Sequence, residues 1–132
     1  MFSIRAILER IFKPPKPDLE EVFGTESLAY AEEFYSGKDD YFWADFRDGD
    51  GKTKRIVFCA YPFSIKSHWV LGSLEEDAEQ MIAVRKSDHK VLLVSNSLVL
   101  GQEEVPIGDS FALFGKRLVL ADPNSPPPKN DP

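Results

Sequence analysis

Two stretches of strand-forming residues flank a turn-forming segment in the middle of the chain. Residues 41–46 (YFWADF) and 54–61 (KRIVFCAY) are rich in aromatic and β-branched side chains, which favour strands. The segment between them, RDGDGK at 47–52, supplies the glycines and aspartates that hairpin turns require. We therefore expect an antiparallel hairpin here, with Pro62 ending its second strand.

A second hairpin is predicted further along the chain. Residues 81–84 (MIAV) and 91–94 (VLLV) are apolar runs on either side of a polar turn, SDHK at 87–90. Residues 68–71 and 97–100 are expected to add short strands. The acidic stretch from 74 to 79 is either a loop or a helical turn.

Helical patterns lie at the two ends of this strand-rich region. Residues 3–12 are a predicted amphipathic helix that the following prolines end, and residues 18–36 are helical in two pieces. Gly24 divides those pieces, Thr25 is positioned to cap the second, and Gly37 lies beyond its end.

Residues 109–120 are compatible with two structures. Asp109 or Ser110 is able to cap a helix that runs through Leu118, which is the structure we favour. Alternatively, residues 111–114 and 117–120 flank a turn at Gly115.

This order of elements predicts an α+β fold. We expect an antiparallel sheet of about five to six strands, with N-terminal helices and a short C-terminal helix packed on one face. The predicted domain spans residues 17–120. An amphipathic helix and proline linker (1–16) precede it, and a proline-rich, disordered tail (121–132) follows.

The charge is unevenly distributed along the chain. The formal net charge of −6 combines +3 over residues 1–16, −8 over residues 17–120 and −1 over the tail. An acidic body repels phosphate backbones, which argues against nucleic acid as a partner and favours a basic protein. Without a bilayer-spanning apolar run or a signal-peptide pattern, we expect a cytoplasmic protein without stable membrane contact.

Motifs for catalysis, metals or cofactors are missing from the sequence. The single cysteine, Cys59, lies in an apolar run and is predicted to be a buried, inert thiol. His68 and His89 are far apart and are interpreted as structural and turn residues, so we expect no zinc site and no nucleophile–base pair. Phosphate-binding glycine motifs are absent as well. We therefore expect a non-enzyme without catalytic residues, metal ligands or cofactor.

The candidate partner-binding residues are carboxylates grouped in predicted connections. Loops carry a large share of binding residues, and acidic loops on a rigid sheet complement a basic target. These candidates are Asp39, Asp40, Glu75, Glu76, Asp77, Glu79, Glu103 and Glu104.

The second half of the chain resembles the SUKH superfamily, whose bacterial members include many immunity proteins against secreted toxins. The resemblance covers about residues 69–118: VLGS at 70–73, an acidic loop, the hairpin 80–94, and VPIGDSFALF at 105–114. In this family a hairpin is commonly followed by a segment like "ADSFEEFL", which Asp109, Ser110, Phe111 and Phe114 match. It implies an α+β fold and inhibition of a toxin by occluding its active surface.

The predicted function is therefore a non-catalytic protein-binding module of the immunity type, monomeric or weakly dimeric, that neutralises a basic toxin. Two alternatives stay open. One is a secretion-type chaperone or adaptor, because such proteins are also small and acidic. The other is a membrane-surface accessory protein that uses the basic, apolar segment 1–16.

Overall fold

The computed structural model contains one seven-stranded sheet in which every neighbouring pair of strands is antiparallel. It describes residues 16–47, 51–95, 104–121 and 124. The strand order is β6-β5-β4-β3-β2-β1-β7. The strands are β1 (Phe42–Arg47), β2 (Thr53–Ile65), β3 (His68–Leu74), β4 (Gln80–Arg85), β5 (Val91–Ser95), β6 (Glu104–Gly108) and β7 (Leu118–Ala121). The helices are α2 (Leu19–Phe23), the 3-10 turn η1 (Thr25–Ser27), α3 (Leu28–Tyr35) and α4 (Phe111–Gly115).

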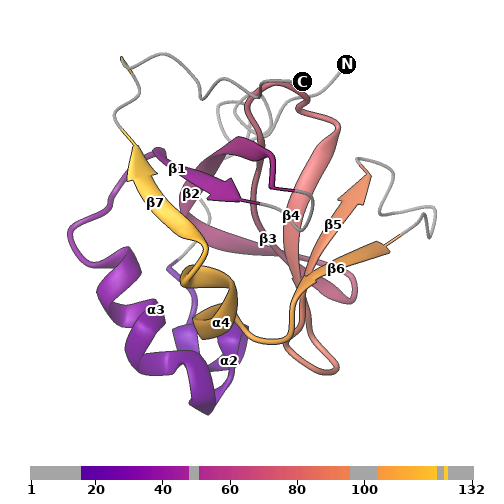
Figure 1. The fold of residues 1–132 in the computed structure, drawn as a ribbon. Helices are drawn as coiled ribbons and strands as arrows, with labels where there is room; N and C mark the ends of the chain where they lie inside the picture. Colours follow the sequence, from indigo (N-terminus) through magenta and orange to yellow (C-terminus); the bar gives the residue numbers. More distant parts are fainter. Residues whose placement is uncertain (1–15, 48–50, 96–103, 122–123, 125–132) are drawn as a thin grey trace.

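The predicted α+β class is confirmed, with more strands than expected. Both predicted hairpins form: β1 pairs with β2 and β4 pairs with β5. The expectation of about five to six strands was too low, because β6 and β7 add one strand at each edge of the sheet. The helices gather on one face of the sheet, as Figure 1 shows. The predicted helix over 3–12, the strand at 97–100 and most of the predicted tail lie outside the described residues.

The main core lies between this helical layer and the sheet. Phe34 of α3 lies at its centre, with its ring centroid 5.2 Å from those of Phe42 and Phe58 and 5.3 Å from that of Phe111. Phe111 also stacks on Phe23 at 4.1 Å. Burying aromatic side chains of this size from five different elements stabilises the helix–sheet contact more than the short helices stabilise themselves.

The helix boundaries follow local capping chemistry. Asp18 caps α2, its carboxylate accepting a hydrogen bond from the backbone N–H of Glu20, and Gly24 ends the helix at a φ of +86°. The expected cap at Thr25 is wrong: residues 25–27 form a 3-10 turn, and the Thr25 hydroxyl donates to Glu20 instead.

Residues 109–120 contain both a helix and a strand. Ser110 caps α4 as one of the two expected residues, but the helix ends at Gly115 and does not run through Leu118. A Cβ at position 115 would lie 2.1 Å from the ring of Tyr30, so this close contact favours glycine. Beyond it, Leu118–Ala121 pairs with β1 and not with a hairpin partner from residues 111–114.

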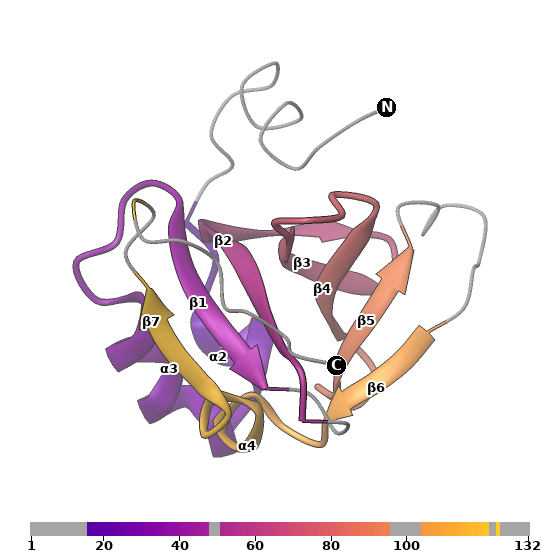
Figure 2. The same ribbon diagram turned by 45° about the horizontal axis from the view of Figure 1, so that its top comes forward.

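The sheet is strongly curled, and its curvature is concentrated in β2 and β3. The prediction that Pro62 ends the second strand was wrong, because β2 continues to Ile65. The β2–β3 register shifts between Phe58 and Phe63, and at such an irregularity a proline removes no ladder hydrogen bond. Gly72 lies opposite, where a Cβ would be 2.0 Å from the Val57 carbonyl oxygen. Figure 2 shows the resulting curl, with β7 and β1 on one side of the view and β5 and β6 on the other.

A second, smaller core forms on the sheet face away from the helices. The curl of the sheet makes this face concave, so its side chains pack against one another. Part-buried Phe63 and Ile65 from the far half of β2 pack against it. Its buried members are Cys59, Val70, Met81, Ala83, Leu92 and Val94.

Candidate functional site

The predicted partner-binding carboxylates do not form one surface. Asp39 and Asp40 are exposed in the connection from α3 to β1, next to the end of β1 that pairs with Phe58. The 75–79 group lies in the connection from β3 to β4, beside Arg55 near the start of β2. Glu103 lies outside the described residues. The structure therefore separates the first pair from the β3–β4 connection.

The β3–β4 connection, which we term the acidic loop (residues 75–79), is the densest of these groups. Glu75, Glu76, Asp77 and Glu79 are all exposed. Its backbone is fixed at both ends, because the Glu75 N–H donates to the Arg55 carbonyl (2.8 Å) and the Gln80 N–H to the Asp77 carbonyl (3.0 Å). The Asp77 side chain also accepts a hydrogen bond from the Glu79 N–H at 3.1 Å. The loop thus presents its carboxylates from a well-supported turn.

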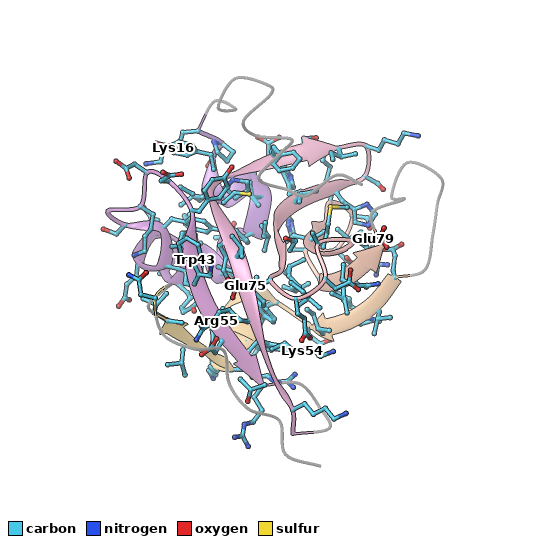
Figure 3. The ribbon with its side chains drawn as sticks, turned by 90° about the horizontal axis from the view of Figure 1, so that it is seen from above. Lys16, Trp43, Lys54, Arg55, Glu75 and Glu79 are labelled. Atoms are coloured by element: carbon cyan, nitrogen blue, oxygen red, sulfur yellow. The ribbon has the colours of Figure 1, made fainter. Side chains whose placement is uncertain are left out.

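One of these carboxylates faces a buried arginine. The Arg55 side chain is 5% exposed, and its Nε donates to Asp45 on the neighbouring strand at 2.8 Å. Glu75 approaches the same Nε at 4.0 Å. Figure 3 shows Arg55 and Glu75 together on the sheet face opposite the helices, with Glu79 further along the loop. Arg55 therefore partly offsets the charge of Glu75.

Glu104 lies apart from the other candidate carboxylates and contacts His68 and Arg85. Its carboxylate lies 2.9 Å from His68 Nε2 and 3.5 Å from Arg85 Nη1. Arg85 also pairs with Asp88, and this hydrogen bond lowers the pKa of Asp88 to about 2. Glu104 is thus engaged within the fold, as the edge member of a small ion network.

The same network places a serine, a histidine and a glutamate in line. Ser67 Oγ lies 3.0 Å from His68 Nδ1, and His68 Nε2 faces Glu104. When the imidazole is neutral, the carboxylate accepts from Nε2–H and Nδ1 accepts from the serine hydroxyl. Nucleophilic catalysis also needs a substrate cavity and donors for an oxyanion. Ser67 and His68 line neither a groove of about 490 Å³ beside β6 nor a cleft of about 270 Å³ beside His89.

Cys59 and His89 also take structural positions. Cys59 is 2% exposed, as predicted, and burial raises its thiol pKa to about 12, so it is not a nucleophile at neutral pH. His89 lies in the predicted turn, but its ring is part-buried: it lies against Gly24 and has Nδ1 3.2 Å from the Val22 carbonyl oxygen. Among the residues described, no group of three or more potential ligands is placed to hold a metal ion.

A groove of about 490 Å³ lies on the helix-bearing face of the sheet, and we term it the β6 groove. The helices cover part of that face, and the groove occupies the part nearer β6. Two cations, Lys54 and Arg117, and one anion, Asp109, are its charged lining residues. The remaining lining residues are Phe46, Leu74, Ile82, Leu93, Val105, Pro106, Ile107 and Gly108.

The sequence did not indicate this groove. Strand alternation alone places Lys54 on the same face as Ile56, but the contribution of Arg117 and β6 depends on how the two sheet edges curl toward each other. A smaller cleft of about 270 Å³ lies beside His89, lined by Glu20, Glu26, Asp88 and Asp109 among others.

Comparisons with protein-family models, with curated proteins and with solved structures found no match to this chain. In the part of the chain that the structure describes, no helix is long and apolar enough to cross a membrane.

Proposed function

We propose that this chain is a non-catalytic protein-binding module of the immunity type, which acts in the cytoplasm on a basic toxin domain. The observation that carries the proposal is the acidic loop, in which four exposed carboxylates occupy one fixed connection between two central strands. A negative surface of this kind raises the association rate of a positively charged partner and rejects like-charged ones.

The fold supports this proposal in a second way. The acidic loop joins β3 to β4, which each have a strand on both sides. Their burial on both faces holds the loop in place, so little conformational entropy is lost when a partner binds. Occlusion of a toxin surface requires such a preformed contact and no chemistry from the inhibitor.

The test is binding to a basic toxin domain encoded beside this chain's gene, measured by surface plasmon resonance at two salt concentrations. Glu76→Lys with Glu79→Lys reverses two loop charges whose carboxylates make no hydrogen bond or ion pair among the described contacts. Because opposite charges steer association, we expect the dissociation constant to rise at least about tenfold and the association rate to fall. The wild-type complex should also weaken as salt increases.

Glu21→Lys with Glu32→Lys is the matched control, since it makes the same change in net charge at exposed helix positions. We expect this control to retain affinity within about threefold and to protect cells that express the toxin. Equal loss in the two double variants, or the absence of any binding and protection, would contradict the proposal.

A further inference from the structure

The two edges of the sheet are protected to different degrees. At one edge, β6 contains Glu104 and Pro106, and its register with β5 shifts between Val91 and Leu92. A charge, a proline and an irregular register each discourage an edge strand from pairing with another chain. At the other edge, β7 has the sequence LVLA at 118–121 and a regular register with β1. In the part of the chain that the structure describes, β7 pairs only with β1.

Both faces of β7 carry exposed apolar side chains. Val119 is 70% exposed, the highest value among the large apolar residues described, and Leu120 is 58% exposed. Leu120 pairs with Ala44, a member of the main core, and so projects on the helix-bearing face, whereas Val119 projects on the opposite face. Adjacent apolar residues on both faces of an unprotected edge are typical of a strand that pairs with another chain.

The backbone groups at the outer edge of β7 follow from its register with β1. The Arg47 N–H donates to the Arg117 carbonyl at 3.3 Å, so these two residues form a hydrogen-bonded pair. Because hydrogen-bonded and non-hydrogen-bonded pairs alternate along an antiparallel ladder, Val119 also bonds to β1. The N–H and C=O groups of Leu118 and Leu120 therefore point away from β1, toward the outer edge.

A second β7 fits this edge in an antiparallel register centred on Val119. Leu118 of each chain then forms a hydrogen-bonded pair with Leu120 of the other, which satisfies the outward groups of both leucines. Val119 meets Val119 of the second copy in a non-hydrogen-bonded pair, with Cα atoms about 4.5 Å apart. Apolar cross-strand pairs of this kind stabilise a sheet. An identical strand thus complements this edge in both its backbone and its side chains.

The charges beside β7 favour the same arrangement. Lys116 is exposed just before β7. Asp40 is exposed just before β1, at the end of the sheet where Ala121 of β7 pairs with Trp43. An antiparallel two-fold pairing brings Lys116 of each copy toward the end of the sheet that carries Asp40 of the other. This local attraction acts within a Debye length of about 8 Å and opposes the repulsion between two chains of net charge −6.

We propose that β7 is a homodimer interface, through which two copies of this chain join their sheets into one continuous antiparallel sheet. β7 has only four residues, so the interface is smaller than the roughly 800 Å² per partner of stable complexes. The dimer is accordingly weak, with a dissociation constant of about 0.01–1 mM. The proposal does not rest on toxin binding, since the acidic loop joins β3 to β4 and lies away from β7.

Two measurements on the full chain test the dimer. Sedimentation velocity from about 10 μM to about 2 mM should show the mean mass rising toward that of two chains. Isotope-filtered NMR of an equimolar mixture of ¹³C-labelled and unlabelled chains should show intermolecular contacts between the Val119 methyl groups. These contacts report the register directly, because only a pairing centred on this residue places the two side chains opposite each other.

A matched pair of variants locates the interface. Val119→Lys places two like charges opposite each other at the two-fold axis and should raise the dissociation constant at least about tenfold. Val105→Lys makes the same change at an exposed apolar residue of the protected edge, and it should dimerise as the wild type does. Circular dichroism and urea unfolding check that both variants are folded.

A second pair of variants tests the backbone pairing. Leu120→Pro removes an N–H that points to the outer edge and not to β1, so it should also raise the dissociation constant at least about tenfold. Leu120→Ala retains this N–H and should have a smaller effect.

Three outcomes would overturn the proposal. The first is a monomer at about 2 mM, including one in which the Val119 signals shift only when a toxin domain is added. The second is equal weakening of the dimer by Val119→Lys and Val105→Lys. The third is a set of intermolecular contacts that spares β7.

Discussion

His68 of β3 and Glu104 of β6 are in hydrogen-bond contact at 2.9 Å, although β4 and β5 separate their strands in the sheet. Glu104 pairs in register with Val94, a member of the second core, and so projects from the same face. The Glu104 side chain thus reaches across this core to His68, and its carboxylate also lies near Arg85. The contact joins the edge strand to the bent strand and stabilises the curl of the sheet.

Replacing Glu104 should test this closing contact. Glu104→Gln retains the shape of the side chain but removes the charge that His68 and Arg85 face. Because Glu104 is 30% exposed, we expect a loss of only about 1 kcal/mol in the free energy of unfolding, measured by urea denaturation. Glu76→Gln, at an exposed carboxylate in the acidic loop, should change stability by less than about 0.5 kcal/mol. Equal effects of the two variants would show that the contact is not stabilising.

The Arg55–Asp45 pair predicts a strongly non-additive double-mutant cycle. Asp45→Leu leaves the buried guanidinium without its nearest carboxylate, with Glu75 at 4.0 Å as a weaker substitute. We expect this variant to lose about 2–4 kcal/mol, because an arginine so nearly buried retains its charge. Adding Arg55→Met should recover much of that loss, since both charges of the pair are then gone. Additive losses in thermal or urea denaturation would contradict this account.

The Tyr35 hydroxyl makes no hydrogen bond among the described residues, although it is fully buried. Burial is the main cause that raises the pKa of the Tyr35 hydroxyl well above its usual value of 10.0. Electrostatic interactions with Cys59 and Tyr30 raise this pKa further. Tyr35→Phe retains the ring contacts with Phe23 and Phe42 and removes the unsatisfied group. The variant should therefore be more stable by about 1 kcal/mol. Tyr61→Phe, at a part-exposed position, serves as the control, and a destabilised Tyr35→Phe would show that the hydroxyl has a partner.

Gly72 should tolerate no side chain. A Cβ at this position would lie 2.0 Å from the Val57 carbonyl oxygen and 2.9 Å from the Phe58 Cα, both of which are backbone atoms of a central strand. Gly72→Ala should therefore lower the free energy of unfolding by about 3 kcal/mol or prevent folding. Gly37→Ala adds the same methyl group in open space at a φ of +73° and should lose only about 1 kcal/mol. Similar losses at the two positions would refute the steric explanation.

Asp88 should contribute to stability above acidic pH. The hydrogen bond from Arg85 lowers its pKa from 3.8 to about 2, so the folded state favours the ionised form. This contribution is complete above about pH 4 and is lost as the pH falls through 2. Carboxyl ¹³C NMR should give a titration midpoint near 2 for Asp88. In Arg85→Gln the midpoint should move toward 3.8, and an unchanged midpoint would exclude Arg85 as the cause.

The fold could be predicted from the sequence where the signals are local. Turn residues between two strand-forming runs identified both hairpins, and Gly24 marked a helix end. The continuation of β2 past Pro62 was not predictable in this way, because only the shifted pairing with β3 makes a proline acceptable there. The division of residues 111–121 into a short helix and a strand was not predictable either. It depends on the contact of Gly115 with Tyr30 and on the pairing with β1, and both partners are distant in sequence.

The acidic loop was determined by the sequence itself, because a run of carboxylates between two strands is exposed in almost any arrangement of those strands. The contacts of Glu104 and Arg117 were decided only by the tertiary structure. Glu104 belongs by sequence to an acidic pair, and the curl of the sheet brings it to His68 and Arg85. Arg117 is one of several surface cations until α4 and β1 place it over Phe46 beside the β6 groove. In each case one decisive neighbour is distant in sequence: His68 is 36 residues from Glu104, and Phe46 lies on β1, far from Arg117.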